Sequence, residues 1–274
     1  MTFDDRMAVR DFYATRSDDE WERLTRDIPG RVAFEVHRRM LERFVTPGMQ
    51  VLEIGAGPGR FTAELARLGA TVTVTDLTPE QLASNRARFT GTAVAEQIAD
   101  WQVLDICDTS SYADGAFDAV VAYGGPLSYA FEGAPGALAG LLRVTQDGGP
   151  VLASVMSMLG SWRHFIGVVL SDVEAAGNDA YRHLMATGDL RSLGAPHICQ
   201  LYRSDDITAL VEGAGAEVLA MSASNWASLG DPEALAEFEA DPMMWAQFLD
   251  DEVAACAAPG ALDGGTHIVF AARA

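Results

Sequence analysis

The clearest pattern of apolar and polar positions lies in Val51–Asp76. A short apolar run at its start is typical of a strand buried on both faces. Three glycines and a proline at residues 55–59 interrupt this run, because they continue neither a strand nor a helix interior. Apolar residues then recur at helical spacing as far as Gly69, and the β-rich stretch Thr71–Thr75 leads to Asp76. The predicted order is strand, glycine turn, helix, strand and acid, which is a nucleotide-binding βαβ unit.

Alternating strands and helices continue along the rest of the chain. Further strands are predicted at Trp101–Leu104, Phe117–Ala122, Val151–Val155, Glu217–Met221 and Thr266–Ala272. Core helices are predicted after a cap at Thr78, with Pro79 in the first helical position, over Ala137–Val144, and from a cap at Ser204 to Glu212. With the two strands of the βαβ unit the sheet has seven strands, and the alternation indicates an α/β fold.

The pattern also divides the chain into parts. The predicted parts are an N-terminal helical cap at residues 1–47 and a core at residues 48–274, with helical insertions at about 157–196 and 231–256. In the cap, Ser17 and Glu20 have the spacing of a capping box. The first insertion has apolar residues at helical spacing and no strand signal, and the second contains two Asp-Pro helix starts. We interpret the insertions as a lid over an enclosed cavity.

Composition restricts the partners of the chain. Its 274 residues carry a formal charge of −20 at pH 7, and every basic residue is an arginine. Such a surface repels phosphate backbones, so nucleic acid is disfavoured as a partner. Cys107, Cys199 and Cys256 are odd in number and far apart, which favours reduced thiols in a cytoplasmic protein. The N-terminus is charged and no apolar run reaches membrane-spanning length, so we expect neither a signal peptide nor a membrane partner.

The glycine turn decides which ligand the βαβ unit binds. A dinucleotide fingerprint would need its third glycine where the chain has Arg60. Instead, the glycines alternate with other residues from Gly55 onward, and an acid, Glu53, stands two residues before the first of them. This E-x-G-x-G-x-G spacing, with an acid closing the next strand, resembles motif I of the class I S-adenosylmethionine-dependent methyltransferases. The alternatives are a glycine turn that only packs helix against strand and a nicotinamide dehydrogenase.

The resemblance implies a doubly wound, mostly parallel, Rossmann-like sheet whose antiparallel last strand lies beside the sixth, and S-adenosylmethionine as cofactor. Asp76 would accept both ribose hydroxyls, because a carboxylate has two acceptor oxygens. The resemblance further implies that Asp105 and Ile106 hold the adenine, and that Tyr13 and Arg31 of the cap contact the methionine carboxylate. The residues expected at the cofactor are Tyr13, Arg31, Glu53, Gly55, Ala56, Gly57, Asp76, Leu77, Asp105, Ile106 and Tyr123.

Methyl transfer from a sulfonium is an in-line displacement whose leaving group needs no acid, so the protein contributes mainly alignment and a dry pocket. A base is needed only where the acceptor must lose a proton, and His197, His164 and Tyr129 are the candidates. His37 and His267 fall inside a predicted helix and strand and are interpreted as structural. The histidines lack the spacing of metal ligands, so we expect no metal site.

These observations favour a methyltransferase that acts on an oxygen, nitrogen or carbon nucleophile of a small molecule, for example a secondary metabolite. The family's catalytic N-methyltransferases of nucleic acids and proteins often carry an Asp/Asn-Pro-Pro-Tyr-like signature after the fourth strand, whereas this chain has YGGPLSY from Tyr123 to Tyr129. A peptide or protein methyltransferase and a non-catalytic S-adenosylmethionine-binding module remain alternatives. The chain is expected to be a monomer or a homodimer.

Overall fold

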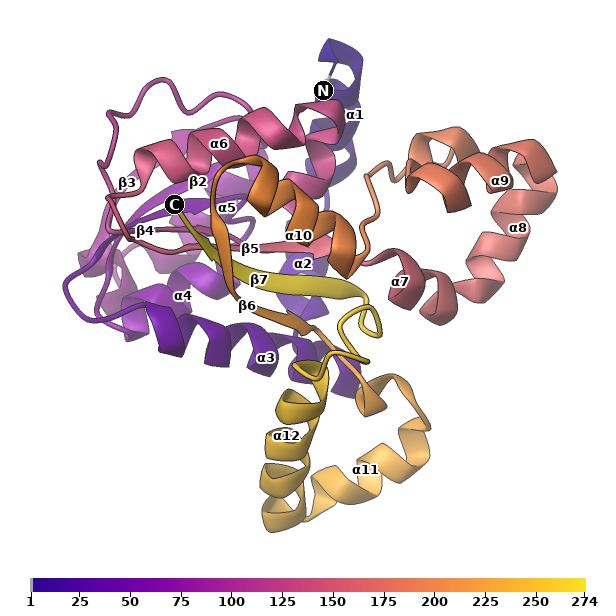
Figure 1. The fold of residues 1–274 in the computed structure, drawn as a ribbon. Coiled ribbons are helices and arrows are strands. Elements are labelled where there is room, and N and C mark those ends of the chain that lie inside the picture. Colours follow the sequence, from indigo (N-terminus) through magenta and orange to yellow (C-terminus); the bar gives the residue numbers. More distant parts are fainter. Residues whose placement is uncertain (1) are drawn as a thin grey trace.

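A central seven-stranded sheet organises the computed structural model, which describes residues 2–274 (Figure 1). The strands are β1 Gln50–Ile54, β2 Thr71–Asp76, β3 Ile98–Val103, β4 Ala119–Ala122, β5 Val151–Met156, β6 Glu217–Ala223 and β7 His267–Arg273. Their order in the sheet is β3-β2-β1-β4-β5-β7-β6. β7 runs antiparallel to both β5 and β6, whereas the other neighbouring strands pair in parallel. This confirms the predicted α/β, doubly wound sheet with an antiparallel last strand.

Helices cover both faces of the sheet, and the side chains of β1 alternate between the two layers. Val51 shares a core cluster with α3 (Ile28–Phe44) and α4 (Arg60–Arg67). Leu52 shares the opposite cluster with α6 (Ala134–Val144) and α10 (Ser204–Gly213). The inner strands are therefore apolar on both faces, which explains the unbroken apolar runs at these strands in the sequence.

The boundaries of several elements differ from the predicted ones. β3 begins at Ile98, three residues earlier than predicted, and β4 begins only at Ala119. The short 3₁₀ helices are η1 Ala93–Gln97, η2 Pro126–Tyr129, η3 Phe131–Gly133, η4 Leu190–Leu193 and η5 Ala227–Leu229. Strand ends are poorly predicted because tertiary pairing, rather than local propensity, decides where a ladder stops.

The predicted helix caps are only partly correct. Thr78 does precede α5 (Pro79–Phe89), but its side chain makes no capping hydrogen bond. Ser204 is the first residue of α10 rather than its cap, and its hydroxyl donates to the carboxylate of Asp263 at 2.7 Å. The capping box predicted at Ser17 is wrong, because Ser17 lies inside α2 (Ser17–Arg23) and no side chain caps that helix. Of these three residues, Ser204 bonds instead to a partner 59 positions away in the sequence.

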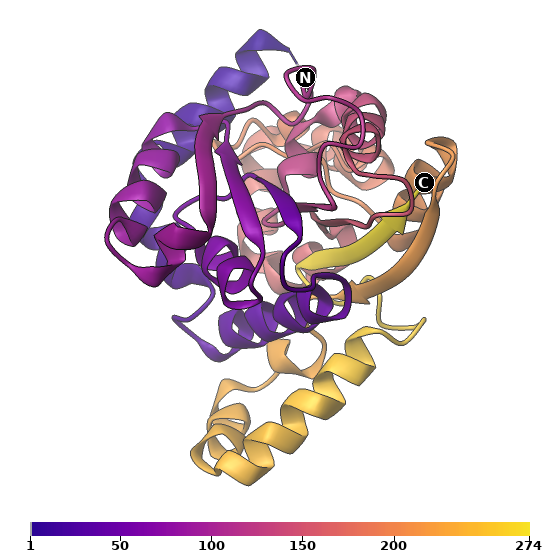
Figure 2. The same cartoon turned by 90° about the vertical axis from the view of Figure 1, so that its left-hand side faces the viewer.

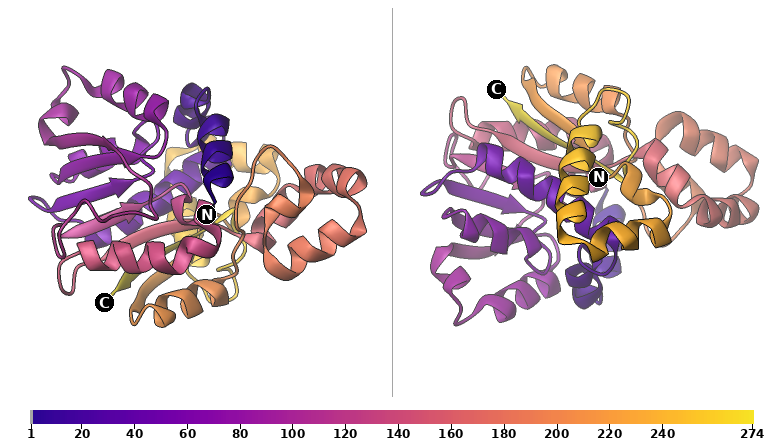
Figure 3. Two further views of the ribbon diagram at one scale, coloured as in Figure 1. Left: turned by 90° about the horizontal axis from the view of Figure 1, so that it is seen from above. Right: turned by 90° about the horizontal axis from the view of Figure 1, so that it is seen from below.

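The side chain of Trp21 packs the N-terminal helices against the core. Its indole ring lies between the guanidinium groups of Arg60 and Arg88, whose central carbons are 3.7 and 3.8 Å from the ring centre. Arg60 also donates from Nε to the carbonyl oxygen of Trp21 at 2.6 Å. Because cation–π contacts add to the packing of the ring, this arrangement holds α2 against α4 and α5. It brings α1 (Phe3–Tyr13) and α2 over one edge of the sheet (Figure 3).

Both regions predicted as insertions are helical. The first contains α7 (Met158–His164), α8 (Ile166–Ala176) and α9 (Asn178–Thr187), of which α8 and α9 project away from the sheet in Figures 1 and 3. The second contains α11 (Pro232–Ala240) and α12 (Pro242–Cys256), which extend below the sheet in Figure 2. The predicted Asp-Pro helix starts are confirmed: Asp231 and Asp241 each accept backbone N–H groups of the helix that follows.

Within residues 2–274, no helix is long and apolar enough to cross a membrane. The three cysteines are free thiols, of which Cys199 and Cys256 are buried. Cys256 ends α12 in the core cluster that also contains α3. An ion pair of 2.7 Å between Arg39 of α3 and Asp250 of α12 joins the same two helices at the surface.

Glu252 is predicted to stabilise the second insertion. Its buried carboxylate accepts the backbone N–H groups of Trp226, Ala227 and Ser228 at 2.8, 2.9 and 2.9 Å. Glu252→Ala leaves these donors without an acceptor and should lower the free energy of unfolding by about 3 kcal/mol or more in urea titrations. The exposed neighbour Asp251→Ala is the matched control and should change it by less than about 0.5 kcal/mol. Equal effects of the two variants would contradict this role.

Candidate functional site

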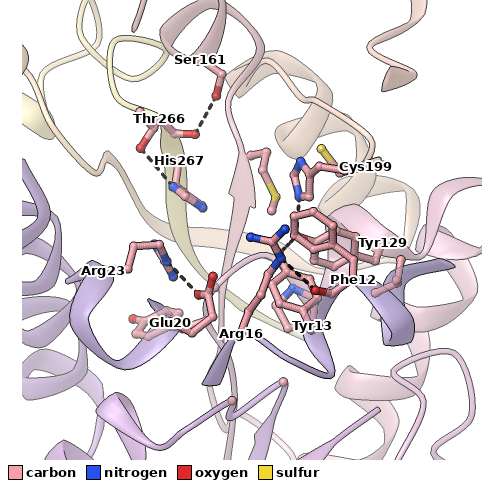
Figure 4. Close-up of a pocket in the computed structure, with 18 of the residues that line it drawn as sticks. Phe12, Tyr13, Arg16, Glu20, Arg23, Tyr129, Ser161, Cys199, Thr266 and His267 are labelled. Carbon is pink, nitrogen blue, oxygen red and sulfur yellow. Dashed lines mark hydrogen bonds and ion pairs between the residues drawn. The ribbon is translucent and has the colours of Figure 1, made fainter. Parts of the chain in front are cut away.

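A cavity of about 930 Å³ lies at the carboxyl ends of the parallel strands. Residues that follow β1, β2, β3, β4 and β5 form one wall, as expected for ligand sites in open α/β sheets. The N-terminal helices α1 and α2 form a second wall, and α7, α8 and α9 form a third. Figure 4 shows how side chains from these separate walls point toward the same space.

The glycine turn after β1 presents its backbone to this cavity. Gly57 has a φ of +53°, and a Cβ added there would meet only Gln81 Oε1, at 3.9 Å. Gly55, with φ +69°, packs so closely on Pro126 that an added Cβ would lie 2.3 Å from its Cγ. The two glycines therefore have different roles: Gly55 allows close packing on the loop after β4, and Gly57 leaves space for a ligand. Ala56, between them, also lines the cavity.

Asp76 holds the turn in this shape. Its two carboxylate oxygens accept the backbone N–H groups of Gly57 and Thr78, both at 2.8 Å. Burial raises the pKa of Asp76 to about 6, although these hydrogen bonds oppose the change. Each oxygen keeps a further lone pair for a ligand. The predicted ribose acid thus lines the cavity, next to Leu77.

Three buried polar atoms of cavity-lining residues have no hydrogen-bond partner within the described part of the chain. They are Oε1 of Gln81, the hydroxyl of Tyr123 and Oδ2 of Asp105, of which only the Asp105 oxygen is in an ion pair. The Nε2 group of Gln81 already donates to the carbonyl oxygen of Tyr13 at 2.7 Å, which fixes the side chain. Buried polar groups normally find partners, so these orphaned atoms indicate a polar ligand in front of the glycine turn.

Glu53 and Arg31 lie outside the cavity lining, although both were predicted to contact the cofactor. Glu53 is buried, and its carboxyl group accepts the hydroxyl of Thr62 at 2.6 Å. Burial raises the pKa of Glu53 to about 8, and the charge of Asp76 acts in the same direction. Arg31 pairs instead with Glu239 of α11, from Nε at 2.8 Å and from Nη2 at 2.7 Å. In this structure both residues connect elements of the fold.

Asp105 and Ile106 line the cavity at the end of β3, where the sequence places the adenine. The carboxylate of Asp105 is already in contact with the chain itself: it accepts the N–H of Cys107 at 2.9 Å and forms an ion pair with Nε of Arg6 at 2.6 Å. Arg6 belongs to α1 and was not predicted from the sequence. No local signal could have found it, because 99 residues separate it from its partner.

Tyr13, Tyr129 and His197 form a hydrogen-bonded chain across the cavity wall. The hydroxyls of Tyr13 and Tyr129 share a hydrogen bond, and Tyr129 shares another with Nε2 of His197 at 3.0 Å. The ring of Phe12 packs on His197 with centroids 5.0 Å apart. Burial raises the pKa of both tyrosines and lowers that of His197, so all three are neutral near pH 7. His164 also lines the cavity, but on α7, where it packs against Phe165.

His37 and His267 do lie in a helix and a strand, as predicted, but both also line the cavity, so the purely structural interpretation is corrected. The Nδ1 atom of His37 is 2.7 Å from the carbonyl oxygen of Ala33 and must donate to it, which leaves Nε2 as an acceptor. Burial lowers the pKa of His37 to about 4 and that of His267 well below its usual value. The spacing of residues in the sequence could not reveal that these two histidines line one cavity, because α3 and β7 lie far apart in the sequence and meet only in the fold.

Glu20 and Arg23 of α2 also reach the cavity and were not predicted as site residues. Their ion pair measures 2.9 Å, and Figure 4 shows it opposite Tyr13 and Tyr129. The site therefore presents one carboxylate and one guanidinium side by side. Within residues 2–274, no group of three or more histidine, cysteine or acidic side chains is arranged to hold a metal ion.

Comparison with known proteins finds a family model that covers the glycine turn and Asp76. Residues 51–149 match a family model described as "Methyltransferase domain". The ubiquinone biosynthesis O-methyltransferase of Xanthomonas campestris is 37% identical over 78 residues, which cover 28% of this chain and 31% of that protein. The malonyl-[acyl-carrier protein] O-methyltransferase of Serratia marcescens is 31% identical over 171 residues, which cover 58% and 62%. The chain thus spans less than two thirds of the length of these relatives.

A solved structure shows the fold over a longer stretch. The 1,6-didemethyltoxoflavin-N1-methyltransferase of Burkholderia thailandensis, bound to its substrate and S-adenosylhomocysteine, has a TM-score of 0.57 at 16% identity, with coverage of 97% of this chain and 87% of that one. The relatives and this structural neighbour are all named as methyltransferases. The matched family model and these names agree with the class I methyltransferase family that the glycine motif indicates.

The perturbed pKa of Glu53 gives a testable pH dependence of stability. Since the folded pKa is about 8 and the ordinary value 4.5, the folded chain holds a proton that the unfolded chain loses between these values. As pH rises from 5 to 8, the free energy of unfolding of the wild type should therefore fall by up to about 1.4 kcal/mol per pH unit relative to that of the Glu53→Gln variant. Glutamine can still accept from Thr62. Urea titrations across this range measure the difference, and a constant difference would show that Glu53 is ionised in the fold.

Proposed function

We propose that this chain belongs to the class I S-adenosylmethionine-dependent methyltransferase family and transfers a methyl group to an oxygen nucleophile of a small molecule, such as a secondary metabolite. The observation that carries the proposal is that one cavity joins the glycine turn and Asp76 to the Tyr13–Tyr129–His197 chain. The first half suits a nucleoside cofactor, and the second suits an acceptor that must lose a proton. Enclosure by α7 and α8 favours a small acceptor over a protein.

Each part of the cofactor has a suitable group in the cavity wall. The remaining lone pairs of Asp76 suit the ribose hydroxyls, and Leu77 and Ile106 suit the faces of the adenine. Asp105 can accept the adenine amine on a remaining lone pair of its carboxylate. The bound cofactor would supply an electrophilic methyl group on a sulfonium. The protein's task is to hold that methyl in line with the acceptor and to exclude water.

The Glu20–Arg23 pair suits the methionine end of the cofactor. That end carries an ammonium and a carboxylate, and the pair offers the complementary carboxylate and guanidinium. Both residues lie on α2, in the part of the chain where contacts to this end were expected. We therefore propose Arg23, rather than Arg31, as the arginine that contacts the carboxylate, since Arg31 is engaged by Glu239. The hydroxyl of Tyr123 offers a further polar contact.

The acceptor's proton would leave through Tyr129 and His197. With Nδ1 protonated, Nε2 of His197 accepts the hydroxyl proton of Tyr129, whose oxygen can in turn accept the proton of an acceptor hydroxyl. As the acceptor oxygen gains the methyl group, its proton passes to Tyr129 and the proton of Tyr129 passes to His197. The imidazole then becomes an imidazolium, and the sulfur leaves as a neutral thioether. Tyr13 orients Tyr129 through the hydroxyl–hydroxyl contact.

Cofactor binding should depend on the ionisation of Asp76. Calorimetry with S-adenosylhomocysteine should show wild-type affinity falling as pH drops below about 6, because protonation removes the charged acceptor. Asp76→Asn should weaken binding about 10- to 100-fold at pH 7.5, the loss of one charged hydrogen-bonding partner, and should abolish this pH dependence. Asp100→Asn, an exposed acid on β3, is the control. Equal affinities for Asp76→Asn and wild type, or tighter binding of a nicotinamide dinucleotide, would refute the cofactor assignment.

Turnover should require His197. With a panel of simple phenols as acceptors and S-adenosylhomocysteine formation as the readout, His197→Gln should lower kcat about 100-fold or more, because the proton loses its final acceptor. Tyr129→Phe should lower it similarly, and neither variant should change the affinity for S-adenosylhomocysteine. The exposed His183→Gln on α9 is the control and should keep full activity. Full turnover by His197→Gln would mean that the acceptor reacts without this base.

A further inference from the structure

Helix α8 is apolar, yet none of its residues is buried. Val168 and Leu170 are each 59% exposed, and Phe165, at the start of the helix, is 48% exposed. A helix of this composition usually packs its apolar side chains in a core, and exposed apolar groups that gather on one element mark a binding surface. The figures show α8 and α9 projecting away from the sheet (Figure 1).

One side of α8 belongs to the cavity described above. Phe165, Val168 and Val169 line the cavity, whereas Ile166 and Leu170 do not. The apolar wall continues onto the neighbouring helices. Its other apolar members are Met158 and Trp162 of α7, Leu184 and Met185 of α9, and Leu190 of η4. This part of the cavity is therefore a hydrocarbon surface made by three helices and a 3₁₀ turn.

The charges of the cavity are distributed unevenly. The Glu20–Arg23 pair, Asp76 and Asp105 lie on the sides formed by α2 and the strand ends. Among the lining residues that the structure describes from α7 to η4, Asp172 is the only aspartate, glutamate or arginine. That wall offers no guanidinium to a carboxylate or phosphate on the ligand, and Asp172 would repel one.

The size of the cavity leaves room beyond a cofactor. A volume of about 930 Å³ is near the upper end of the range for a single ligand, roughly 300–1,000 Å³. The polar sides account for a nucleoside cofactor and a reacting hydroxyl. The apolar wall then has to be covered by another part of the acceptor, since exposed hydrocarbon is unfavourable in water.

We propose that the acceptor is amphipathic, with its hydroxyl at Tyr129 and His197 and a long uncharged hydrocarbon group along Phe165, Val168 and Val169. This inference rests on the proposed function, because the hydroxyl is positioned by the same cavity. It adds a substrate class that the methyl-transfer site alone does not define. The helix α8 serves as the specificity element, and its cavity-lining side becomes covered when the hydrocarbon group binds.

A homologous series of ligands tests this directly. The probes are 4-ethyl-, 4-butyl-, 4-hexyl- and 4-octylphenol, titrated below their aqueous solubility limits into the full chain saturated with S-adenosylhomocysteine. Each added methylene should tighten binding to the wild type about three- to fourfold, the value for complete burial of a methylene, or somewhat less where burial is partial. An affinity that does not change along the series would overturn the proposal.

Two substitutions with equal exposure separate the cavity side of α8 from its outer side. Val168→Asp should weaken octylphenol binding at least about 10-fold and leave ethylphenol binding within about twofold. Leu170→Asp, on the outer side, should change neither. Val168→Thr keeps the shape of the side chain and should give a smaller loss in the same direction, which covers the case that Val168→Asp disturbs the fold. Equal losses at positions 168 and 170 would overturn the proposal.

A separate titration keeps this test distinct from that of the proposed function. The affinity for S-adenosylhomocysteine is measured first for every variant and should be unchanged. If the wild type does not bind S-adenosylhomocysteine, the proposed function fails. If it binds S-adenosylhomocysteine but shows no dependence on the length of the alkyl chain, only the amphipathic acceptor is rejected.

Discussion

The hydrogen bonds that Asp76 accepts from the backbone N–H groups of Gly57 and Thr78 are the interaction on which the site depends. They join the end of β2 to the turn after β1 and to the start of α5. Without a carboxylate at this position, two backbone N–H groups facing the interior would lack an acceptor, and the turn could close over the space in front of it. The same carboxylate faces the cavity, so one side chain both shapes the site and offers it an acceptor.

The cavity is completed by segments that are far apart in the sequence. The N-terminal helices reach it because Trp21 is held between Arg60 and Arg88. Helices α7 and α8 reach it because they follow β5, whose carboxyl end lies at the same edge of the sheet. Since neither segment contributes a strand, both can differ in sequence without changing the sheet. On the proposed function, the sheet would define where the cofactor lies, and the added helices would determine which acceptor can enter.

The sequence allowed the sheet, the glycine turn and the two helical insertions to be predicted, because each has a local signature. Apolar runs mark the buried strands, and the glycines with Glu53 and Asp76 mark the turn. Most errors at the site concern contacts between distant segments, as with Arg31, which pairs with Glu239, 208 positions away. The capping box at Ser17 is a local error, because the helix begins at Ser17 itself. His37 and His267 looked structural because a residue inside a helix or strand can still border a cavity formed elsewhere.

The ion pair between Arg6 and Asp105 has a consequence for the N-terminal helix. A carboxylate oxygen that is already in an ion pair keeps a lone pair for a second donor, so on the proposed function the purine base and Arg6 would share Asp105. Occupation of the adenine position and the attachment of α1 to the sheet would then depend on one side chain, and each would reinforce the other.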